Sequence, residues 1–303
     1  MDTILCAVDF SPFTPETVRV GAGLATRCGA RLVLFHAVAF AIDGIFASDR
    51  PERGIKARRL TREARRRLEA LAAGVATPCE LMLADGDPME VLQERVQTRN
   101  VDLIVTASRG IGGIERLFVG TVVERMVVHV PRPILILRPG RGGPPRKAPP
   151  EFGRILVGCD LRQPRDPAVD FARRLALCLQ AELHLLHVLE APLDEALNDT
   201  YEEFQRTLIE GTARRLEAMC PDYQPGERIF TAVYPGVPAE ALRRCAGQTG
   251  CDLIVVGVHR VGALKGALIG TTARQLLHKA PCSLLTVPES VSTNSPATAR
   301  RKR

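Results

Sequence analysis

The segment ILCAVD at residues 4–9 returns as ILVGCD at residues 155–160, and this recurrence decides how the chain folds. ARLVLFHAV at 30–38 returns as AELHLLHVL at 181–189, and VDLIVTAS at 101–108 returns as CDLIVVGV at 251–258. The copies keep register to within one residue, at a separation of 150 or 151. Solenoid repeats are only about 20–50 residues long. The period therefore indicates a duplicated domain.

Within each copy, apolar strands alternate with amphipathic helices. In the first copy we expect strands at 4–8, 32–37, 80–83, 103–106 and 134–137, and helices at 14–28, 55–73, 88–98 and 120–129. In the second we expect strands at 154–158, 183–188, 229–233, 253–256 and 283–287, and helices at 166–180, 199–219, 238–248 and 271–279. Near-continuous aliphatic strands separated by helices predict a parallel sheet covered on both faces. The predicted fold class is α/β, with two tandem doubly wound domains that each contain a five-stranded parallel sheet.

The repeat divides the chain into four parts. They are a first domain at 1–138, a Pro/Gly-rich linker at 139–153, a second domain at 154–288 and a basic tail at 289–303. We expect the domains to pack as an intramolecular pseudo-dimer through their last strands, because equivalent surfaces most often meet about a twofold axis. Association of whole chains into a homo-oligomer is left open.

Composition and charge exclude several classes of protein. The 303 residues are 46% hydrophobic and 25% charged, as in a globular chain. Aromatic residues make up 4%, too few for a base-stacking surface. Of the net charge of +7, residues 138–152 and 289–303 contribute +3 each, so we expect no nucleic-acid partner. No apolar run approaches the ~18 residues of a membrane span, and the first residues lack the basic region of a signal peptide.

Cysteines occur singly along the whole sequence. They stand at positions 6, 28, 79, 159, 178, 220, 245, 251 and 282, with no CxxC among them. An odd number of isolated cysteines is typical of reduced thiols in a cytoplasmic protein and not of a disulfide framework or a zinc site. We expect core packing for them and not a redox role.

The candidate binding residues follow the strands, since ligands of such sheets bind beyond the carboxyl ends of the strands. Asp9 ends the first strand and Asp160 stands at the same place in the second copy. Each carboxylate could bind a ribose hydroxyl or an amine, or cap the next helix, and both alternatives stay open. After the fourth strand, Gly110 and Gly120 lead into Thr121 and a helix. Glycines and a helix start offer N–H groups to a phosphate. The alternative is an ordinary glycine-containing loop, and the recurrence of Gly-Thr at 270–271 weakens it.

Other motifs of nucleotide binding and catalysis are missing from the sequence. It contains no GxxxxGK[ST], no GxGxxG after the first strand, no HExxH and no GxSxG. His36 and His187 end strands, and we interpret them as structural. No general base, nucleophile or metal-binding carboxylate pair can be assigned, so we do not expect an enzyme.

At these residues the chain resembles the universal stress protein family, in its tandem form with two domains. The family signature is Gly, two residues, Gly, nine residues, Gly, then Ser or Thr. The first copy matches at Gly110, Gly120 and Thr121 but has Ala107 for the first glycine. The second matches at Gly257, Gly270 and Thr271 but has Arg260 for the second glycine. The AVDFS start at 7–11 and the VDLIV strand are also similar to the family.

The resemblance implies ATP binding in an adenine-nucleotide α-hydrolase-like fold, with Mg²⁺ able to accompany the nucleotide. In the first copy, Asp9 would face the ribose, and Ala37 and Thr106 the adenine. Ala107 and the residues Arg109, Gly110, Gly120, Thr121 and Val122 would form the loop around the phosphates. The matching residues of the second copy are Asp160, Val188, Val256, Gly257, His259, Gly270, Thr271 and Thr272.

The two departures from the signature differ in their expected effect on the loop. Ala107 adds a methyl group that a negative φ tolerates. Arg260 would strain the loop if the position needs a positive φ, and could bind phosphate if it does not. We therefore favour the first site. The leading hypothesis is a cytoplasmic ATP-binding stress or signalling protein; the alternatives are a nucleotide-free scaffold for protein contacts and a slow ATPase.

Overall fold

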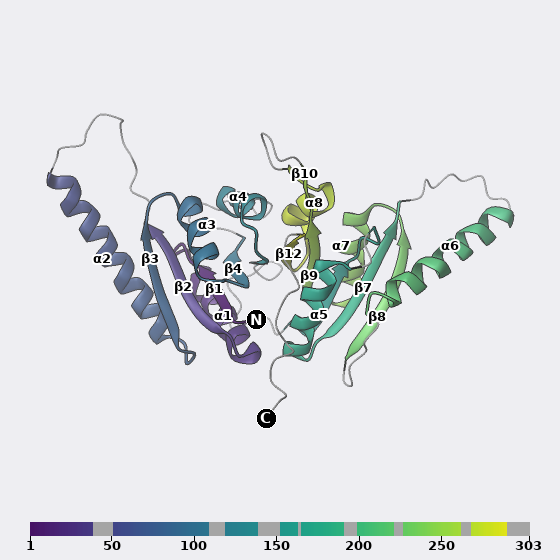
Figure 1. The fold of residues 1–303 in the computed structure, drawn as a ribbon, viewed down its shortest axis with the longest axis horizontal. Coiled ribbons are helices and arrows are strands. Elements are labelled where there is room, and N and C mark those ends of the chain that lie inside the picture. Colours follow the sequence, from purple (N-terminus) through teal and green to yellow (C-terminus); the bar gives the residue numbers. More distant parts are fainter. Residues whose placement is uncertain are drawn as a thin grey trace, which may run out of the picture.

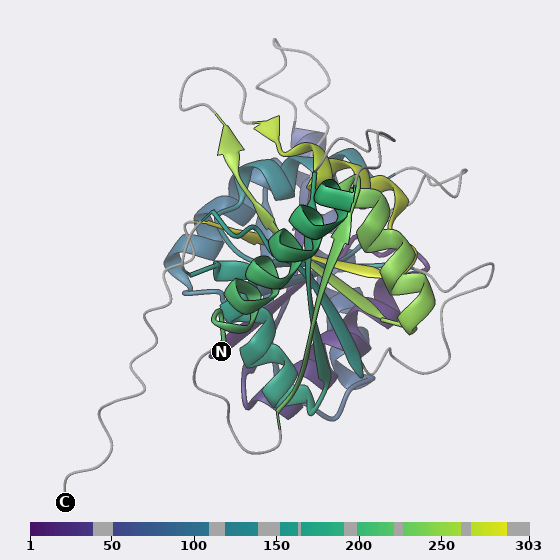
Figure 2. The ribbon, with the colours of Figure 1, turned by 90° about the vertical axis from the view of Figure 1, so that its right-hand side faces the viewer.

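The computed structural model describes residues 1–38, 51–108, 119–138, 152–162, 165–190, 199–220, 227–261 and 268–289. Its centre is one ten-stranded sheet that runs through both copies, with helices on its two faces (Figure 1). Turned by 90°, the strands pass through the middle of the molecule and the helices flank them (Figure 2).

The first copy supplies five strands and four helices in alternation. They are β1 (Thr3–Ala7), α1 (Thr14–Cys28), β2 (Arg31–Val38), α2 (Pro51–Ala73), β3 (Cys79–Asp85), α3 (Pro88–Thr98), β4 (Leu103–Ala107), α4 (Thr121–His129) and β5 (Ile134–Leu137). The strands lie in the order β3-β2-β1-β4-β5, and each pairs with its neighbours in parallel.

The second copy repeats this course. Its elements are β6 (Arg154–Gly158), α5 (Pro167–Leu179), β7 (Glu182–Leu189), α6 (Asp199–Glu217), β8 (Arg228–Pro235), α7 (Pro238–Thr249), β9 (Leu253–Val258), α8 (Thr271–Lys279) and β12 (Ser283–Pro288). Its strands lie in the equivalent order, β8-β7-β6-β9-β12, again all parallel. The predicted α/β class, with a five-stranded parallel sheet in each copy, is confirmed. A short hairpin, β10 (Arg260–Val261) with β11 (Leu268–Ile269), is an addition that the sequence pattern does not predict.

Local signals in the sequence start and stop these helices. α3 and α5 each begin with a proline, whose missing N–H costs nothing at that position. The residue before each proline is a capping aspartate, Asp87 or Asp166. α1 and α7 end at Gly29 and Gly250, both in the left-handed conformation that glycine adopts without strain.

The two copies join through their last strands. β5 and β12 pair antiparallel, with Leu135 opposite Leu285, at the strands where the sequence analysis expects the copies to meet. Beyond this pair, the guanidinium of Arg138 in the first copy donates to main-chain carbonyls at the end of α8 in the second. The joint is therefore made of sheet, side-chain and helix contacts together.

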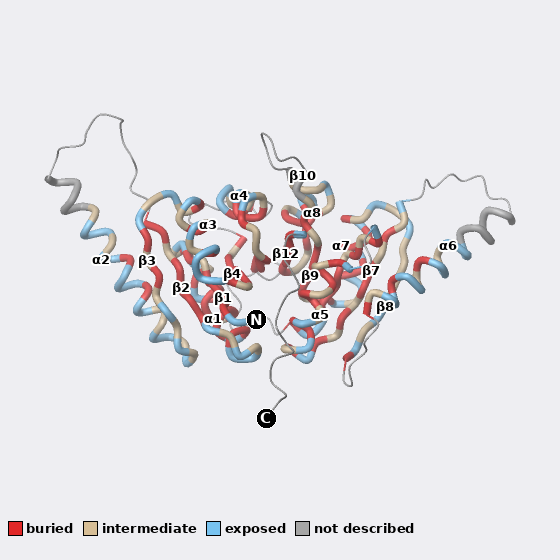
Figure 3. Tube along the Cα trace, in the orientation of Figure 1, coloured by how far each residue is buried: buried red, intermediate tan, exposed pale blue. Residues whose placement is uncertain are grey.

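The hydrophobic core has two layers, one on each face of the sheet, and each layer contains residues of both copies. One lies under α1, α2, α5 and α6, and the other under α3, α4, α7 and α8. Burial follows the strands, whereas the described parts of the long helices α2 and α6 are exposed on their outer sides (Figure 3). Among the described residues, no helix is both long and apolar enough to cross a membrane.

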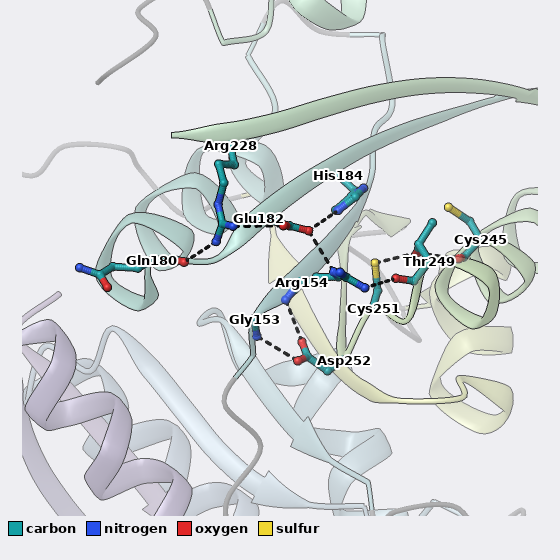
Figure 4. Close-up of polar contacts among 10 residues, drawn as sticks. All are labelled: Gly153, Arg154, Gln180, Glu182, His184, Arg228, Cys245, Thr249, Cys251 and Asp252. Carbon is teal, nitrogen blue, oxygen red and sulfur yellow. Dashed lines mark hydrogen bonds and ion pairs between the residues drawn. The ribbon is translucent and has the colours of Figure 1, made fainter. Parts of the chain in front are cut away.

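Charged side chains connect the amino ends of the second-copy strands (Figure 4). The Asp252 carboxylate accepts from the main-chain N–H of Gly153 at 2.9 Å. Glu182 pairs with Arg154 at 3.0 Å and with Arg228 at 3.2 Å. Desolvation tends to raise the pKa of Glu182, but the hydrogen bonds and positive charges around it outweigh that effect, so its pKa lies below the usual value. These contacts anchor the start of the second domain where the chain enters it.

Candidate functional site

A cavity of about 620 Å³ lies at the carboxyl ends of the strands in the second copy. The ends of β6, β7 and β9 and the first turns of α5, α7 and α8 surround it. All the second-copy residues singled out from the sequence line this cavity: Asp160, Val188, Val256, Gly257, His259, Gly270, Thr271 and Thr272. Residues up to 112 positions apart in the chain are thus gathered at one place.

Apolar side chains form the inner wall of the cavity. Val188 and Val256 come from neighbouring parts of the sheet and are 9% and 3% exposed. Leu186 and Leu242 add further buried aliphatic surface from β7 and α7. A flat apolar group, such as a nucleobase, suits a wall of this kind, because most small-molecule sites are apolar with a few placed polar groups.

A cluster of charged side chains around Asp160 also lines the cavity. Arg162 Nε lies 2.5 Å from Asp160 Oδ2, and His259 Nε2 lies 3.4 Å from the same oxygen. The other ring nitrogen of His259 contacts Glu289. Partial burial tends to raise the pKa of Asp160, but hydrogen bonds and charge from Arg162, with His259, outweigh it and hold the pKa below the usual value. Asp160 is therefore ionised and already in contact with Arg162 and His259 in this structure.

The helix-capping role that was an alternative for Asp160 belongs to another residue. Asp166 accepts from the main-chain N–H of Ala168 at 2.8 Å and so caps α5. In the first copy Asp9 accepts from the N–H of Ser11 at 2.9 Å and from Thr14 Oγ1 at 3.2 Å. Asp160 makes the equivalent main-chain contact, since its Oδ1 accepts from the N–H of Arg162 at 3.1 Å. Both carboxylates thus stabilise the turn after the first strand of their copy, and Asp160 also lines the cavity.

The start of α8 also lines the cavity. Gly270 precedes the helix with φ −55°, and its N-cap position makes no side-chain hydrogen bond. A Cβ atom on Gly257 or on Gly270 would meet nothing within 4 Å, so the backbone here is open to a ligand. The free N–H groups of a first helical turn suit an anion, and Thr271 and Thr272 add hydroxyl groups.

The structure also bears on the two departures from the signature. Gly257 does not have a positive φ, which explains why Ala107 can stand at the equivalent position of the first copy. Arg260 begins the strand β10, an extended conformation that any residue adopts without strain. The side chain of Arg260 lies outside the described residues.

The first-copy residues lie at the carboxyl ends of the first-copy strands, which is the equivalent position in that copy, and the antiparallel pairing of β5 with β12 turns these ends away from those of the second copy. Asp9 follows β1, Ala37 lies in β2, and Thr106 and Ala107 end β4, so three neighbouring strands present them. Gly120, Thr121 and Val122 begin α4, and the Gly120 N–H donates to the Ser108 carbonyl at the end of β4 at 3.1 Å. Thr121 and Val122 are exposed. Arg109 and Gly110 lie outside the described residues.

His36 and His187 have matching positions and matching partners. His36 Nδ1 lies 2.7 Å from the carbonyl of Val8, and His187 Nδ1 lies 2.9 Å from the carbonyl of Cys159. Each imidazole therefore fixes the main chain just before the aspartate that follows the first strand of its copy. Desolvation lowers the pKa of His36. His187 also lines the second-copy cavity.

Several lining residues are not among those predicted from the sequence, and five of them are charged. They are Arg162, Arg165, Asp166, Glu190 and Glu289. Four carboxylates and two guanidinium groups thus line the described part of the cavity. A signal for two of them exists in the repeat, because Arg162 replaces Ser11 and Glu289 replaces Arg138 at a separation of 151.

Comparisons with known proteins agree with this architecture. The model of the Universal stress protein family matches residues 1–138 and again 151–288. A universal stress protein of Thermus aquaticus is 32% identical over 136 residues, which are 45% of this chain and 98% of that protein. A universal stress protein E homolog of Haemophilus influenzae is 24% identical over 215 residues, with 66% of each chain covered. The crystal structure of a universal stress protein from Archaeoglobus fulgidus has a TM-score of 0.64 at 18% identity and covers 94% of this chain and 98% of its own. That likeness shows the fold alone.

Proposed function

This chain belongs to the universal stress protein family, and from that premise we propose that it is a cytoplasmic ATP-binding stress or signalling protein that does not turn over the nucleotide efficiently. The observation that carries the proposal is the convergence of all eight matched second-copy residues on one cavity. Its volume of about 620 Å³ lies within the range of about 300–1,000 Å³ that is usual for small-molecule sites. The nine free thiols support the cytoplasmic part of the proposal.

The chemistry of the cavity fits the three parts of an adenine nucleotide. The aliphatic wall at Val188 and Val256 would hold the base. The carboxylate of Asp160 would accept a hydrogen bond from a ribose hydroxyl. The start of α8, with Thr271 and Thr272, would donate to the phosphates. By register, Ala37, Thr106, Asp9 and Thr121 would take these roles in the first copy.

The charges of the cavity support binding of the nucleotide together with a cation. The described lining residues include more carboxylates than guanidinium groups, which disfavours a bare triphosphate. Mg²⁺ is usually bound through one or two carboxylates together with substrate phosphates. Among the described residues, no group of three His, Cys, Asp or Glu side chains could hold a metal by itself. Mg²⁺ would therefore arrive with ATP.

One observation favours a second candidate, the nucleotide-free scaffold. Arg162 and His259 already occupy the carboxylate of Asp160, so a ribose has to displace or share existing contacts. If that contact is permanent, the second copy serves mainly as a structural partner of the first. A slow ATPase is the third hypothesis.

Two measurements on the whole chain separate these functions. The first is denaturation of the freshly purified protein, which should release a bound adenine nucleotide. The second is calorimetric titration of the nucleotide-free protein with ATP and Mg²⁺. Thr121→Val and Thr271→Val should each weaken one site by about 0.5–3 kcal/mol, or roughly two- to 150-fold, since each removes a hydroxyl donor.

Thr98→Val provides the matched control, because Thr98 is an exposed threonine whose hydroxyl bonds within α3, to the Glu94 carbonyl at 3.0 Å. It should leave the affinity for ATP unchanged. No released nucleotide and no heat of binding would make the scaffold the better hypothesis. Phosphate released from ATP in the same samples tests for hydrolysis.

A further inference from the structure

The equivalent helices α1 and α5 pack against each other across the joint between the two copies. Both contribute to the core layer on the same face of the sheet. Their last turns meet, because the guanidinium of Arg27 in α1 donates to the main-chain carbonyl of Leu179 in α5. The ends of these two helices are therefore fixed relative to each other.

A pair of cysteines lies at this meeting point. Cys28 is the last residue of α1, and Cys178 is the last but one of α5. Their thiols lie close enough to interact electrostatically, although they belong to different copies and are 150 residues apart. Both are half-buried, so a small oxidant can reach them from solvent.

The other cysteines have thiol neighbours only within their own copy, as far as the electrostatic contacts of the described residues go. Cys6 lies near Cys79 in the first copy. In the second copy Cys159 lies near Cys220, and Cys251 lies near Cys245 and Cys282. The pair at the ends of α1 and α5 is thus distinguished by joining the two domains.

We propose that Cys28 and Cys178 form a site of reversible oxidation, at which a peroxide produces a disulfide that links α1 to α5. The sequence alone predicts core packing for both residues, because nothing in their spacing brings position 28 near position 178. The contact exists only because the duplicated domains face each other with equivalent helices.

The reaction balances with hydrogen peroxide as the oxidant. The sulfur of one cysteine attacks the peroxide, an S–O bond forms, the O–O bond breaks, and water leaves to give a sulfenic acid. The sulfur of the other cysteine then attacks the sulfenic sulfur, the S–S bond forms, and the S–O bond breaks with loss of a second water. Two thiols and one peroxide thus give one disulfide and two waters.

Burial raises the pKa of Cys28 to about 12, with contributions from the neighbouring thiol of Cys178. The thiol of Cys28 is therefore protonated at neutral pH. A disulfide needs an S–S bond of about 2.05 Å, so rotation of the side chains at the two helix ends has to bring the sulfurs together.

The test oxidises the reduced wild-type chain with hydrogen peroxide, blocks the remaining thiols by alkylation, and maps peptides by mass spectrometry without reduction. We expect a linked pair of peptides that contain Cys28 and Cys178, lighter than the reduced pair by two hydrogen atoms. On a non-reducing gel the monomer should run faster than the reduced chain, because the cross-link closes a long loop, and a reducing agent should reverse the shift.

Variants separate this site from the remaining thiols. Cys28→Ser and Cys178→Ser should each abolish the fast-running monomer. Cys79→Ser, at another half-buried cysteine, should keep it. Singly alkylated Cys28 and Cys178 in the oxidised wild type, a fast form that persists in Cys28→Ser, or a linkage between two chains would each overturn the proposal.

Discussion

The guanidinium of Arg162 holds the carboxylate of Asp160 inside the second-copy cavity, with 2.5 Å between Nε and Oδ2. The first copy has Ser11 at the equivalent position, where its main-chain N–H donates to Asp9 at 2.9 Å. The main-chain N–H of Arg162 makes the same contact with Asp160 at 3.1 Å, so the charged side chain is what distinguishes the second copy. A ligand hydroxyl that approaches Asp160 therefore competes with a guanidinium group as well as with the turn, whereas at Asp9 it competes with the turn before α1. The two sites of one chain differ in what a ribose must displace.

Replacing Arg162 with serine, the first-copy residue, should raise the affinity of the second site for adenosine by up to about fivefold. The ion pair is exposed on the arginine side, and exposed pairs are worth about 0.2–1 kcal/mol. Adenosine is the right probe because it lacks phosphates. Loss of the Arg162 guanidinium therefore cannot lower the affinity through weaker attraction of phosphate groups. Arg165→Ser is the control, since Arg165 lines the same cavity without a described ion pair to Asp160. A weaker binding of adenosine by Arg162→Ser would mean that the guanidinium contacts the ligand.

The carboxylate of Asp166 should affect the stability of the protein in two ways, as the cap of α5 and as a buried charge. Asp166→Ala removes the acceptor for the Ala168 N–H and should lower the free energy of unfolding by about 0.5–2 kcal/mol. Asp166→Asn keeps an acceptor oxygen and removes the charge. Comparing the two variants by urea unfolding therefore separates capping from ionisation.

The pH dependence of these variants has a definite sign. Desolvation raises the pKa of Asp166, with a further contribution from the charge of Asp160, and main-chain hydrogen bonds oppose it only in part. A raised pKa means that ionisation costs stability in the folded state, fully above that pKa and not at all below the unfolded value of about 3.9. Asp166→Asn should thus match the wild type at about pH 3 and below, exceed its stability increasingly as the pH rises towards the folded-state pKa, and keep a constant advantage above that pKa. A constant difference between pH 4 and pH 8 would contradict this.

The fold is predictable from the sequence because its strands consist of short runs of aliphatic residues. The run LIV at 103–105 and its repeat at 253–255 become the first three residues of β4 and β9, almost fully buried. Their burial on both faces of a parallel sheet is what makes the pattern strong. The hairpin β10–β11 has two-residue strands, which are too short to show any periodicity.

The candidate site is predictable in position but not in its charges. Register carries Asp160, Thr271 and their partners to one edge, because the carboxyl ends of parallel strands meet there. The contact of His259 with Asp160 and Glu289 depends on side-chain conformations, which a sequence pattern does not fix. The differences between the copies were the available signal, since Arg162 and Glu289 change the charge at otherwise repeated positions.

Substitution by alanine should have a much smaller effect on stability at Gly257 than at Gly236. Gly257→Ala places a methyl group where no atom lies within 4 Å and where φ is not positive, so it should change stability by less than about 1 kcal/mol. Gly236 has φ +125°, and Gly236→Ala should cost about 1–3 kcal/mol by backbone strain alone, since nothing lies near its Cβ either. Thermal unfolding of both variants measures this, and equal losses would show that strain does not distinguish the two positions.

Arg138 connects the copies through the end of a helix. Its guanidinium donates to the carbonyl of Leu276 at 3.2 Å and of His278 at 3.3 Å, and it also contacts Leu277. The Leu276 carbonyl also accepts from the Ala280 N–H at 2.9 Å, but the carbonyls after it belong to the last turn, where a helix has no further N–H donors. A cation there also interacts favourably with the helix dipole. A residue of the first copy thus supplies the C-terminal cap of α8 in the second.

Arg138→Ala should therefore destabilise both copies together, by about 1–3 kcal/mol, because it leaves carbonyls of α8 without their charged donor. We expect one cooperative unfolding transition in the wild type, since both core layers and the sheet run through the joint, and the variant should shift that whole transition. Arg99→Ala is the control: Arg99 pairs with Glu80 at 2.8 Å on the exposed surface of the first copy, and its loss should cost no more than about 1 kcal/mol. Calorimetry and urea unfolding followed by circular dichroism measure both effects. Two separate transitions, with only one moved by Arg138→Ala, would show that the copies unfold independently and that the cap acts on α8 alone.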